Sequence, residues 1–346
     1  MFFSKKDNSL IAKYGNETVL IEPWGKNALR VRATLYPTFS GEDKALMPAP
    51  KYNTKIEIRE NSAEITNGKI TAFFHKNGWL EFYRGEKLIL KEYYRDFSFA
   101  NEHSPCMRVV AREYKPLVGG DYALTLRFDA SDEKIFGMGQ YQQPNFNLKG
   151  CVLELAQRNS QVSVPFYLSS LGYGFLWNSE GIGEAVFGSN FTRFTSLSGK
   201  EFDYWITADD TPKKIIENYT EVVGRAPEFP ENALGLWQSK LRYRTQDEVL
   251  SVAREYHRRG VPLDVIVIDF FHWIRQGDWA FDPEYWPDPI GMTKELHEMG
   301  TQCMVSIWPT VDKKSVNFEP MQERGLLIRT ERGSNQCFDF QGDTVI

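Results

Sequence analysis

Four side chains with distinct chemistry stand just after stretches that are expected to be β-strands. Asp269 ends the run that begins at Leu263, which is apolar at residues 265–268, and Phe271 follows it two residues later. Trp308 closes another short apolar stretch, and Arg242 follows a third. A carboxylate and a guanidinium can each make several hydrogen bonds, whereas aromatic rings form flat apolar walls. If these strands are parallel, their carboxyl ends meet at one edge, and the four residues become candidates for one binding site.

Three of these residues also have a purely structural interpretation. The carboxylate of Asp269 could cap a nearby amide or pair with Arg275. Trp308 could belong to an ordinary core, and Phe271 could pack beneath the loop that follows it. The sequence alone therefore leaves both interpretations open for each of the three.

Other reactive constellations are not found in the sequence. The five histidines have no metal-ligand spacing, and no Ser–His–Asp arrangement can be argued. No G-x-G-x-x-G segment or P-loop follows an expected strand. Lys240 is the sole candidate for a Schiff-base lysine, and Asp278 and Asp282 are interpreted as loop anchors. We therefore expect neither a metal nor a cofactor.

Strands and helices alternate after residue 226. The predicted strands span residues 233–239, 263–269 and 301–308, and the predicted helices span residues 245–260, 288–300 and 316–324. The first helix opens on a capping box, Thr245-Gln246-Asp247-Glu248. Such alternation predicts a parallel sheet, either the start of a (β/α)8 barrel or an open doubly wound sheet. The long loop after the second strand favours the barrel.

The first 225 residues have a different periodicity. Apolar and polar residues alternate at 29–34, 55–59 and 122–128, which is the pattern of half-buried strands. Asn77-Gly78 predicts a hairpin turn, because both residues tolerate positive φ. Only Pro212–Val223 has a helical pattern. Many short strands with turn signals predict a β-sandwich, so the expected domains are residues 1–225 and 226–346.

The composition is that of an ordinary globular protein. The net charge is −5 with interspersed signs, so we expect no nucleic-acid partner. No apolar run is long enough to span a membrane, and no secretion signal is seen, so the expected location is cytoplasmic. The four scattered cysteines are interpreted as buried, reduced thiols. The aromatic content of 14% fits either a carbohydrate-binding protein or aromatic-rich β structure. A homo-oligomer is compatible with the sequence.

Six segments in register resemble the motifs of one enzyme family, glycoside hydrolase family 31. They are Phe136-Gly137-Met138-Gly139-Gln140, the stretch from Val164 to Asn178, Gly235–Lys240 with Arg242-Tyr243, Pro262–Asp269, the loop motifs from Asp278 to Pro289, and Ser306-Ile307-Trp308-Pro309. The resemblance covers residues 130–325. Gln140 and Trp177-Asn178 are most similar to the α-xylosidase-type branch, and α-glucosidases remain an alternative.

The resemblance implies a retaining α-glycosidase that removes terminal, non-reducing α-xylosyl or α-glucosyl residues from oligosaccharides. It implies a galactose-mutarotase-like β-sandwich followed by the first part of a catalytic (β/α)8 barrel. Asp269 would accept hydrogen bonds from sugar hydroxyls, Trp308 and Phe271 would line the sugar pocket, and Arg242 stands where relatives carry an aromatic residue.

The two reacting carboxylates of the family are expected beyond Ile346, so the resemblance implies no catalytic residue within the chain. The 121 residues from Ala226 to Ile346 are also fewer than the ~250 that a complete barrel needs. We therefore expect the chain alone to lack turnover. The alternatives are a non-catalytic carbohydrate-binding module, an unrelated aldolase-type barrel and a remnant without function.

Overall fold

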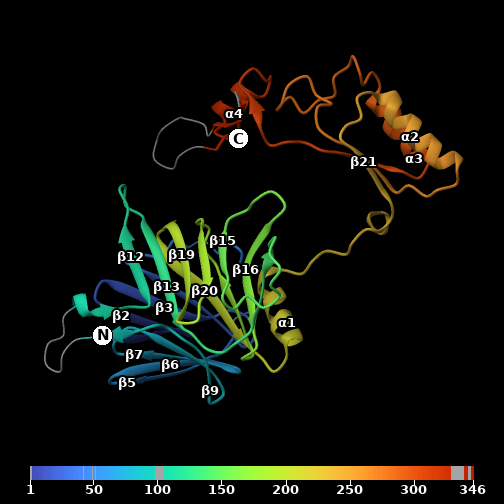
Figure 1. Cartoon of the computed structure of the whole chain (residues 1–346). Helices are drawn as coiled ribbons and strands as arrows, with labels where there is room; N and C mark the ends of the chain where they lie inside the picture. The colour runs from blue at the N-terminus through green and yellow to red at the C-terminus, as the bar shows by residue number, and fades with distance from the viewer. Residues whose placement is uncertain are drawn as a thin grey trace. The chain divides into compact units, whose positions relative to one another are not determined.

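The computed structural model describes residues 2–41, 43–48, 50, 52–97, 105–328, 339–341 and 344–346. The chain divides into two compact units, Met1–Ala226 and Pro227–Ile346 (Figure 1). Each unit has a core of its own.

Antiparallel sheets build the first unit (Figure 1). An eight-stranded sheet has the order β1-β2-β3-β4-β20-β17-β16-β14, and two five-stranded sheets have the orders β12-β13-β19-β18-β15 and β5-β6-β7-β8-β9. A short ladder joins β10 to β11. The strands are β1 Phe2–Lys6, β2 Ser9–Tyr14, β3 Glu17–Pro23, β4 Ala28–Thr34, β5 Lys55–Arg59, β6 Ser62–Asn67, β7 Ile70–His75, β8 Leu80–Arg84, β9 Lys87–Lys91, β10 Arg95–Asp96, β11 Arg108–Val109, β12 Arg112–Pro116, β13 Tyr122–Asp129, β14 Ile135–Gln140, β15 Val152–Leu155, β16 Val162–Ser169, β17 Tyr173–Trp177, β18 Gly183–Phe187, β19 Phe191–Gly199 and β20 Glu201–Ala208. A 3-10 turn, η1, spans Pro105–Met107.

The three large sheets share one core, as expected when each strand turns alternate side chains inward. Aromatic rings fill its centre: Phe175 lies 5.1 Å from Phe194 and 5.4 Å from Tyr167, measured between ring centroids. The predicted hairpin at Asn77-Gly78 joins β7 to β8. Gly78 has a φ of +91°, which glycine adopts without strain. The β-sandwich prediction is confirmed.

The alternation at residues 29–34 was misleading in one respect. It placed Arg30 on a solvent face, but Arg30 is fully buried. Its Nε and Nη2 donate to the two carboxylate oxygens of Asp203 on β20, at 3.0 and 2.8 Å, and its Nη1 donates to Asp43 at 2.8 Å. Burial would lower the pKa of this guanidinium, but the two carboxylates raise it above its ordinary value. The carboxylate of Asp203, which is far from Arg30 in the sequence, compensates the charge of the buried guanidinium.

Helix α1, Pro212–Val223, matches the helix predicted there. Thr211 caps it by accepting from the amide of Lys214, and the proline at its first turn needs no hydrogen-bond acceptor. Ile215 and Val222 pack against Trp205 on the outer face of β20. As a result, every residue of β20 is buried.

Asp209, which follows β20, is buried among donors. Lys69 Nζ and the amide of Asp210 donate to Oδ1, at 2.7 and 2.8 Å, and Asn27 Nδ2 donates to Oδ2 at 2.9 Å. Burial alone would raise the pKa of Asp209, but these hydrogen bonds lower it to about 2. The ionised form is therefore the one that the fold stabilises.

The lowered pKa of Asp209 predicts an acid-dependent loss of stability. The ionised carboxylate should contribute roughly 1–2 kcal/mol above pH 4, because its pKa is higher in the unfolded chain, and this contribution should fade as the pH drops from 4 towards 2. Asp209→Asn mimics the protonated acid. Urea unfolding at pH 6, 4 and 3 should show the wild type losing its advantage over this variant as the pH falls. A difference that stays constant over this range would contradict the prediction.

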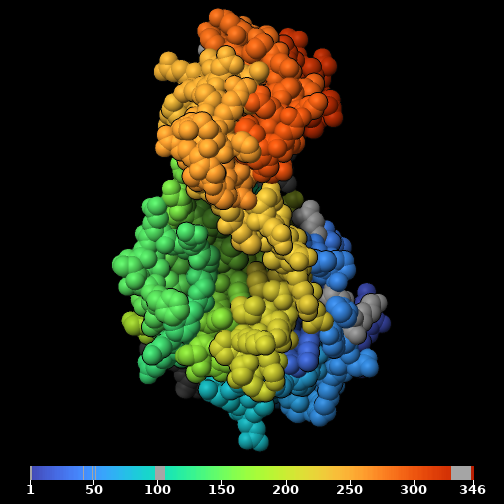
Figure 2. All heavy atoms as spheres, turned by 90° about the vertical axis from the view of Figure 1, so that its right-hand side faces the viewer, coloured from blue at the N-terminus to red at the C-terminus, as the bar shows by residue number. Residues whose placement is uncertain are grey.

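The second unit contains a parallel sheet with the order β21-β22-β23. Its strands are β21 Trp237–Lys240, β22 Val265–Ile268 and β23 Gln302–Val305, and its helices are α2 Gln246–Arg258, α3 Pro289–Glu298 and α4 Phe318–Glu323. A 3-10 turn, η2, spans Glu231–Leu234. A small sheet, β24-β26-β25, joins β24 Val311–Asp312, β25 Asp339–Gln341 and β26 Thr344–Val345. The atoms of α2, α3 and the strands that follow, coloured from orange to red, pack against one another in the space-filling view (Figure 2).

The three predicted strand–helix units are present with shorter elements. The strand predicted from residue 233 begins at Trp237, because residues 231–234 form the 3-10 turn. Thr245 caps α2 by accepting from the Glu248 amide, as the capping box predicts. The Glu248 carboxylate, however, accepts from the Arg244 amide rather than from that of Thr245. The small sheet was not predicted.

Helices α2 and α3 cover one face of the parallel sheet. Val249 and Ala253 of α2 and Met292 and Leu296 of α3 form a buried cluster with Ile266 and Ile268 of β22. The helices are also linked by Arg254, which donates to both carboxylate oxygens of Glu295 at 2.5 and 2.8 Å. The two helices are thereby held together on this face of the sheet.

The expectation of buried thiols is not met by the described cysteines. Cys106 is exposed, and Cys151 and Cys303 are half-buried free thiols. Cys337 lies outside the described residues. Among the described residues, no helix combines the length and the apolar character needed to cross a membrane.

Candidate functional site

The carboxyl ends of the three parallel strands are aligned. Lys240 pairs with Ile268, and Ile268 pairs with Val305, at the last position of each strand. Arg242, Asp269 and Trp308 follow these ends by two, one and three residues. Parallel pairing therefore brings the predicted residues to one edge of the sheet, where barrel enzymes bind their ligands.

Asp269 is half-buried directly after β22. Its Oδ1 accepts from the backbone amide of Phe270 at 2.8 Å, which is the local capping that the structural interpretation predicted. An ion pair with Arg275, the other structural alternative, is not among the ion pairs of the described residues. The amide contact fixes one oxygen, while Oδ2 makes no hydrogen bond within the described part of the chain. An ionised carboxylate held in this way can accept bonds from ligand hydroxyls.

An aromatic residue that the sequence reasoning missed connects the predicted ones. The ring of Phe270 stacks on Trp308, with centroids 5.3 Å apart and planes 9° apart, and lies 4.2 Å from the ring of Phe271. Phe271 is 49% exposed and has a φ of +63°. The three rings form an apolar surface beside Asp269. In the sequence, the two adjacent aromatic residues that follow the strand-end aspartate could have indicated a role for Phe270.

Arg242 contacts this aromatic surface from the first strand. Its guanidinium carbon lies 5.1 Å from the centre of the Phe271 ring, and its Nη1 donates to the Phe271 carbonyl oxygen at 3.3 Å. The guanidinium makes no ion pair within the described residues. Arg242 therefore positions Phe271 and leaves further donors at the strand-end edge.

The loop after β22 is anchored by the acids that were interpreted as structural. Asp278 accepts from the amides of Arg275 and Val316, at 3.1 and 3.2 Å, and Asp282 accepts from the amide of Glu284 at 3.0 Å. Trp279 Nε1 donates to the carbonyl oxygen of Trp308 at 3.0 Å. The loop therefore fixes the backbone at Trp308.

Two other polar residues near this edge do not fit a catalytic role. His272 is 3% exposed, and burial lowers its pKa, so it is neutral at pH 7. The Lys240 ammonium is exposed and paired with Glu248, which does not fit a Schiff-base lysine, because such a lysine needs a desolvated amine. No group of three or more His, Cys, Asp or Glu side chains in the described ranges is arranged to hold a metal ion.

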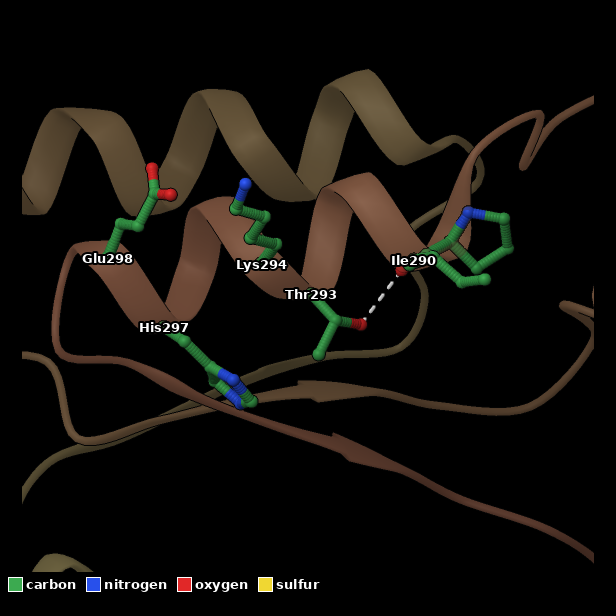
Figure 3. A pocket seen from close by; sticks show the side chains of 6 residues that line it. Ile290, Thr293, Lys294, His297 and Glu298 are labelled. Carbon is green, nitrogen blue, oxygen red and sulfur yellow. Dashed lines mark hydrogen bonds between the residues drawn. The ribbon is translucent and has the colours of Figure 1, made fainter.

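An open cavity of about 720 Å³ lies away from the strand ends, along the outer side of α3 (Figure 3). Ile290, Lys294 and His297 are among its lining residues, all from this one helix. The Thr293 hydroxyl there is already bonded to the carbonyl oxygen of Pro289 at 2.8 Å. Polar groups from a second element do not converge on it, so the strand ends remain the candidate site.

Comparisons with known proteins point to one enzyme family. Residues 226–346 match the model of the glycosyl hydrolases family 31 TIM-barrel domain. An uncharacterized family 31 glucosidase of Pseudescherichia vulneris is 50% identical over an alignment that covers 98% of this chain and 66% of that protein. Alpha-xylosidase A of Aspergillus niger is 34% identical, with coverages of 99% and 49%.

A solved structure has the same fold over the whole chain. It is a GH31 α-xylosidase from a soil metagenome, complexed with xylose. The TM-score is 0.93 and the identity 49%, and the alignment covers 100% of this chain and 52% of that one. The chain thus spans between about half and two thirds of the length of these relatives. The expected fold class is confirmed: a β-sandwich precedes the first part of a (β/α)8 barrel.

Proposed function

The chain belongs to glycoside hydrolase family 31, and we propose that its residues form the sandwich and the first part of the barrel of a retaining α-glycosidase. The proposed substrates are oligosaccharides or aryl glycosides with a terminal, non-reducing α-xylosyl residue, or an α-glucosyl residue in the alternative case. The proposed domains are residues 1–225 and 226–346. The proposed location is the cytoplasm, since Cys151 and Cys303 are free thiols, as a reducing compartment favours.

One observation carries this proposal: a carboxylate and an aromatic surface stand together at the carboxyl edge of the parallel sheet. Asp269 offers acceptor oxygens for sugar hydroxyls, because only its Oδ1 is engaged by the Phe270 amide. Phe271 and Trp308, joined through Phe270, offer rings for the apolar faces of a pyranose. In this proposal Asp269 binds and orients the sugar, and Arg242 holds Phe271 in place.

Catalysis by a retaining glycosidase needs two carboxyl groups about 5–5.5 Å apart, one as nucleophile and one as acid and base. Among the described strand-end residues only Asp269 presents a carboxylate towards this edge, because Asp278 and Asp282 are engaged as loop anchors. We propose that the 346 residues bind the sugar but do not turn it over by themselves.

Two measurements test the proposed function. The purified chain should release no p-nitrophenol from p-nitrophenyl α-D-xyloside. A chimera that joins residues 1–346 to the remaining part of the soil-metagenome α-xylosidase should hydrolyse it, because the 49% identity extends over the whole chain. Turnover by the chain alone would refute the proposed inactivity. A folded chimera that hydrolyses neither the xyloside nor the corresponding α-glucoside would refute the proposed function.

A further inference from the structure

The sandwich unit contains a cavity of about 180 Å³ that has no role in the proposed function. The cavity is bounded by the β2–β3 turn, the β7–β8 turn and the start of β12; β2, β3, β7 and β12 are labelled in Figure 1. Three tyrosines from separate segments, Tyr14, Tyr94 and Tyr114, line it. Its volume is several times that of one water molecule and lies below the ~300–1,000 Å³ of pockets for drug-sized ligands. It therefore suits a ligand of a single ring.

The tyrosine walls are held by neighbouring groups. The Tyr14 ring lies against the backbone of Gly78, where an added Cβ would come within 2.9 Å of the ring. Tyr94 is stacked with Trp79, with planes 18° apart and centroids 6.3 Å apart. Flat aromatic surfaces fixed in advance lower the entropy that is lost on binding. Such surfaces complement the C–H faces of a pyranose.

A buried ionic group lies beside the tyrosines. Arg112 Nε and Nη2 donate to the two carboxylate oxygens of Glu17, at 2.9 and 3.1 Å, and Arg112 also pairs with Glu92. The hydroxyl of Tyr114 donates to Glu17 Oε1 at 2.9 Å. The buried guanidinium faces two carboxylates, so the group has no excess positive charge to attract an anion. Of these charged groups Arg112 and Glu17 line the cavity, whereas the fully buried Glu92 does not. The two lining charges are opposite and paired, so the cavity wall favours a neutral ligand over an anion or a cation.

Free polar groups remain around the cavity for hydroxyl recognition. Asn16 and Asn77 are exposed lining residues, and their amide groups make no hydrogen bond within the described part of the chain. Each amide can donate and accept at once. Glu17 Oε2 receives one hydrogen bond from Arg112 and retains capacity for another. A hydroxyl-rich ligand matches this mixture of donors and acceptors.

We propose that this cavity is a second, non-catalytic saccharide site that holds one neutral pyranose ring. The ring would stack on Tyr94, with Tyr14 as a further wall of the cavity, and hydrogen-bond to Glu17, Asn16 and Asn77. Such a site would hold a glycan chain on the sandwich unit without taking part in bond cleavage. This inference does not depend on the strand-end site, and its test is arranged accordingly.

Saturation-transfer NMR with methyl α-D-xylopyranoside and methyl α-D-glucopyranoside tests the site in the full chain carrying Asp269→Ala. This background removes the carboxylate of the strand-end site, so the two proposals can fail separately. Both glycosides should bind, while glucose 6-phosphate and choline should bind at least about tenfold more weakly than the better glycoside. No binding of either glycoside, or a preference for the charged probes, would overturn the inference.

Two variants locate the binding. Tyr94→Ala should weaken it about five- to tenfold through the loss of one stacking surface. Val110→Trp should abolish it, because the half-exposed Val110 lines the cavity and a larger side chain there would fill it. Tyr83→Ala on β8, away from the cavity, is the matched control and should bind as strongly as the parent. If a correctly folded Val110→Trp chain binds the glycosides as well as the parent, the cavity is not the site.

Discussion

Changing Asp269 to asparagine is expected to lower kcat/KM for p-nitrophenyl α-D-xyloside by about 10²–10⁴-fold in the chimeric enzyme. The proposed role of Asp269 is to accept two hydrogen bonds from sugar hydroxyls, and bonds to a charged acceptor are each worth about 1.5–3 kcal/mol. Asparagine has nearly the same shape, and its carbonyl oxygen can still accept from the Phe270 amide. The loss should therefore come from the missing charge and acceptor rather than from a changed fold.

The matched control is Asp282→Asn in the same loop. The Asp282 carboxylate accepts only from the Glu284 amide among the described residues, and an asparagine oxygen can replace that bond. This variant should retain kcat/KM within about threefold, since substitutions away from a ligand usually have effects below ~0.5 kcal/mol. Equal activity losses in the two variants would mean that Asp269 serves the loop and does not bind the sugar.

Local signals predicted the elements that local interactions determine. The helix Pro212–Val223, the cap at Thr245 and the hairpin at Asn77-Gly78 each depend on residues within a few positions of one another. Such features can be read from one short window of sequence. The apolar runs of the second unit also predicted where its strands end. The sequence therefore indicated that Asp269 and Trp308 lie at one edge of the parallel sheet.

Features that depend on distant partners were not predictable in this way. Arg30 alternates with apolar residues like a solvent-facing residue, and its burial depends on Asp203, which is 173 positions away. Phe270 was missed because its role depends on stacking with Trp308, which lies on another strand end. The small sheet β24-β26-β25 requires segments separated by a long stretch of chain. Alternation alone contains no information about such partners.

The buried pair of Arg30 and Asp203 leads to the largest expected change in stability. Both side chains are fully buried, and Asn178 also donates to Asp203 Oδ2 at 2.8 Å. Asp203→Asn would leave the guanidinium with the half-exposed Asp43 as its remaining carboxylate among the described ion pairs. Removing one partner of a buried pair destabilises a protein by about 3–5 kcal/mol, because the other charge stays buried. The free energy of unfolding of the sandwich unit should fall by this amount.

Hydrogen exchange of the β4 and β20 amides, followed by mass spectrometry during urea titration, would measure this loss in the sandwich unit itself. Glu57→Gln is the matched control, because Glu57 pairs with Lys55 and Arg59 on an exposed strand, where such pairs contribute about 0–1 kcal/mol. The double variant Arg30→Met with Asp203→Leu should be less destabilised than Asp203→Asn, since the carboxylate that loses its arginine partner, Asp43, is half-exposed and can be solvated. If Asp203→Asn unfolds at the same urea concentration as Glu57→Gln, the buried pair does not stabilise the sandwich. If the double variant is the least stable of the three, shape complementarity at these positions outweighs the electrostatic effect.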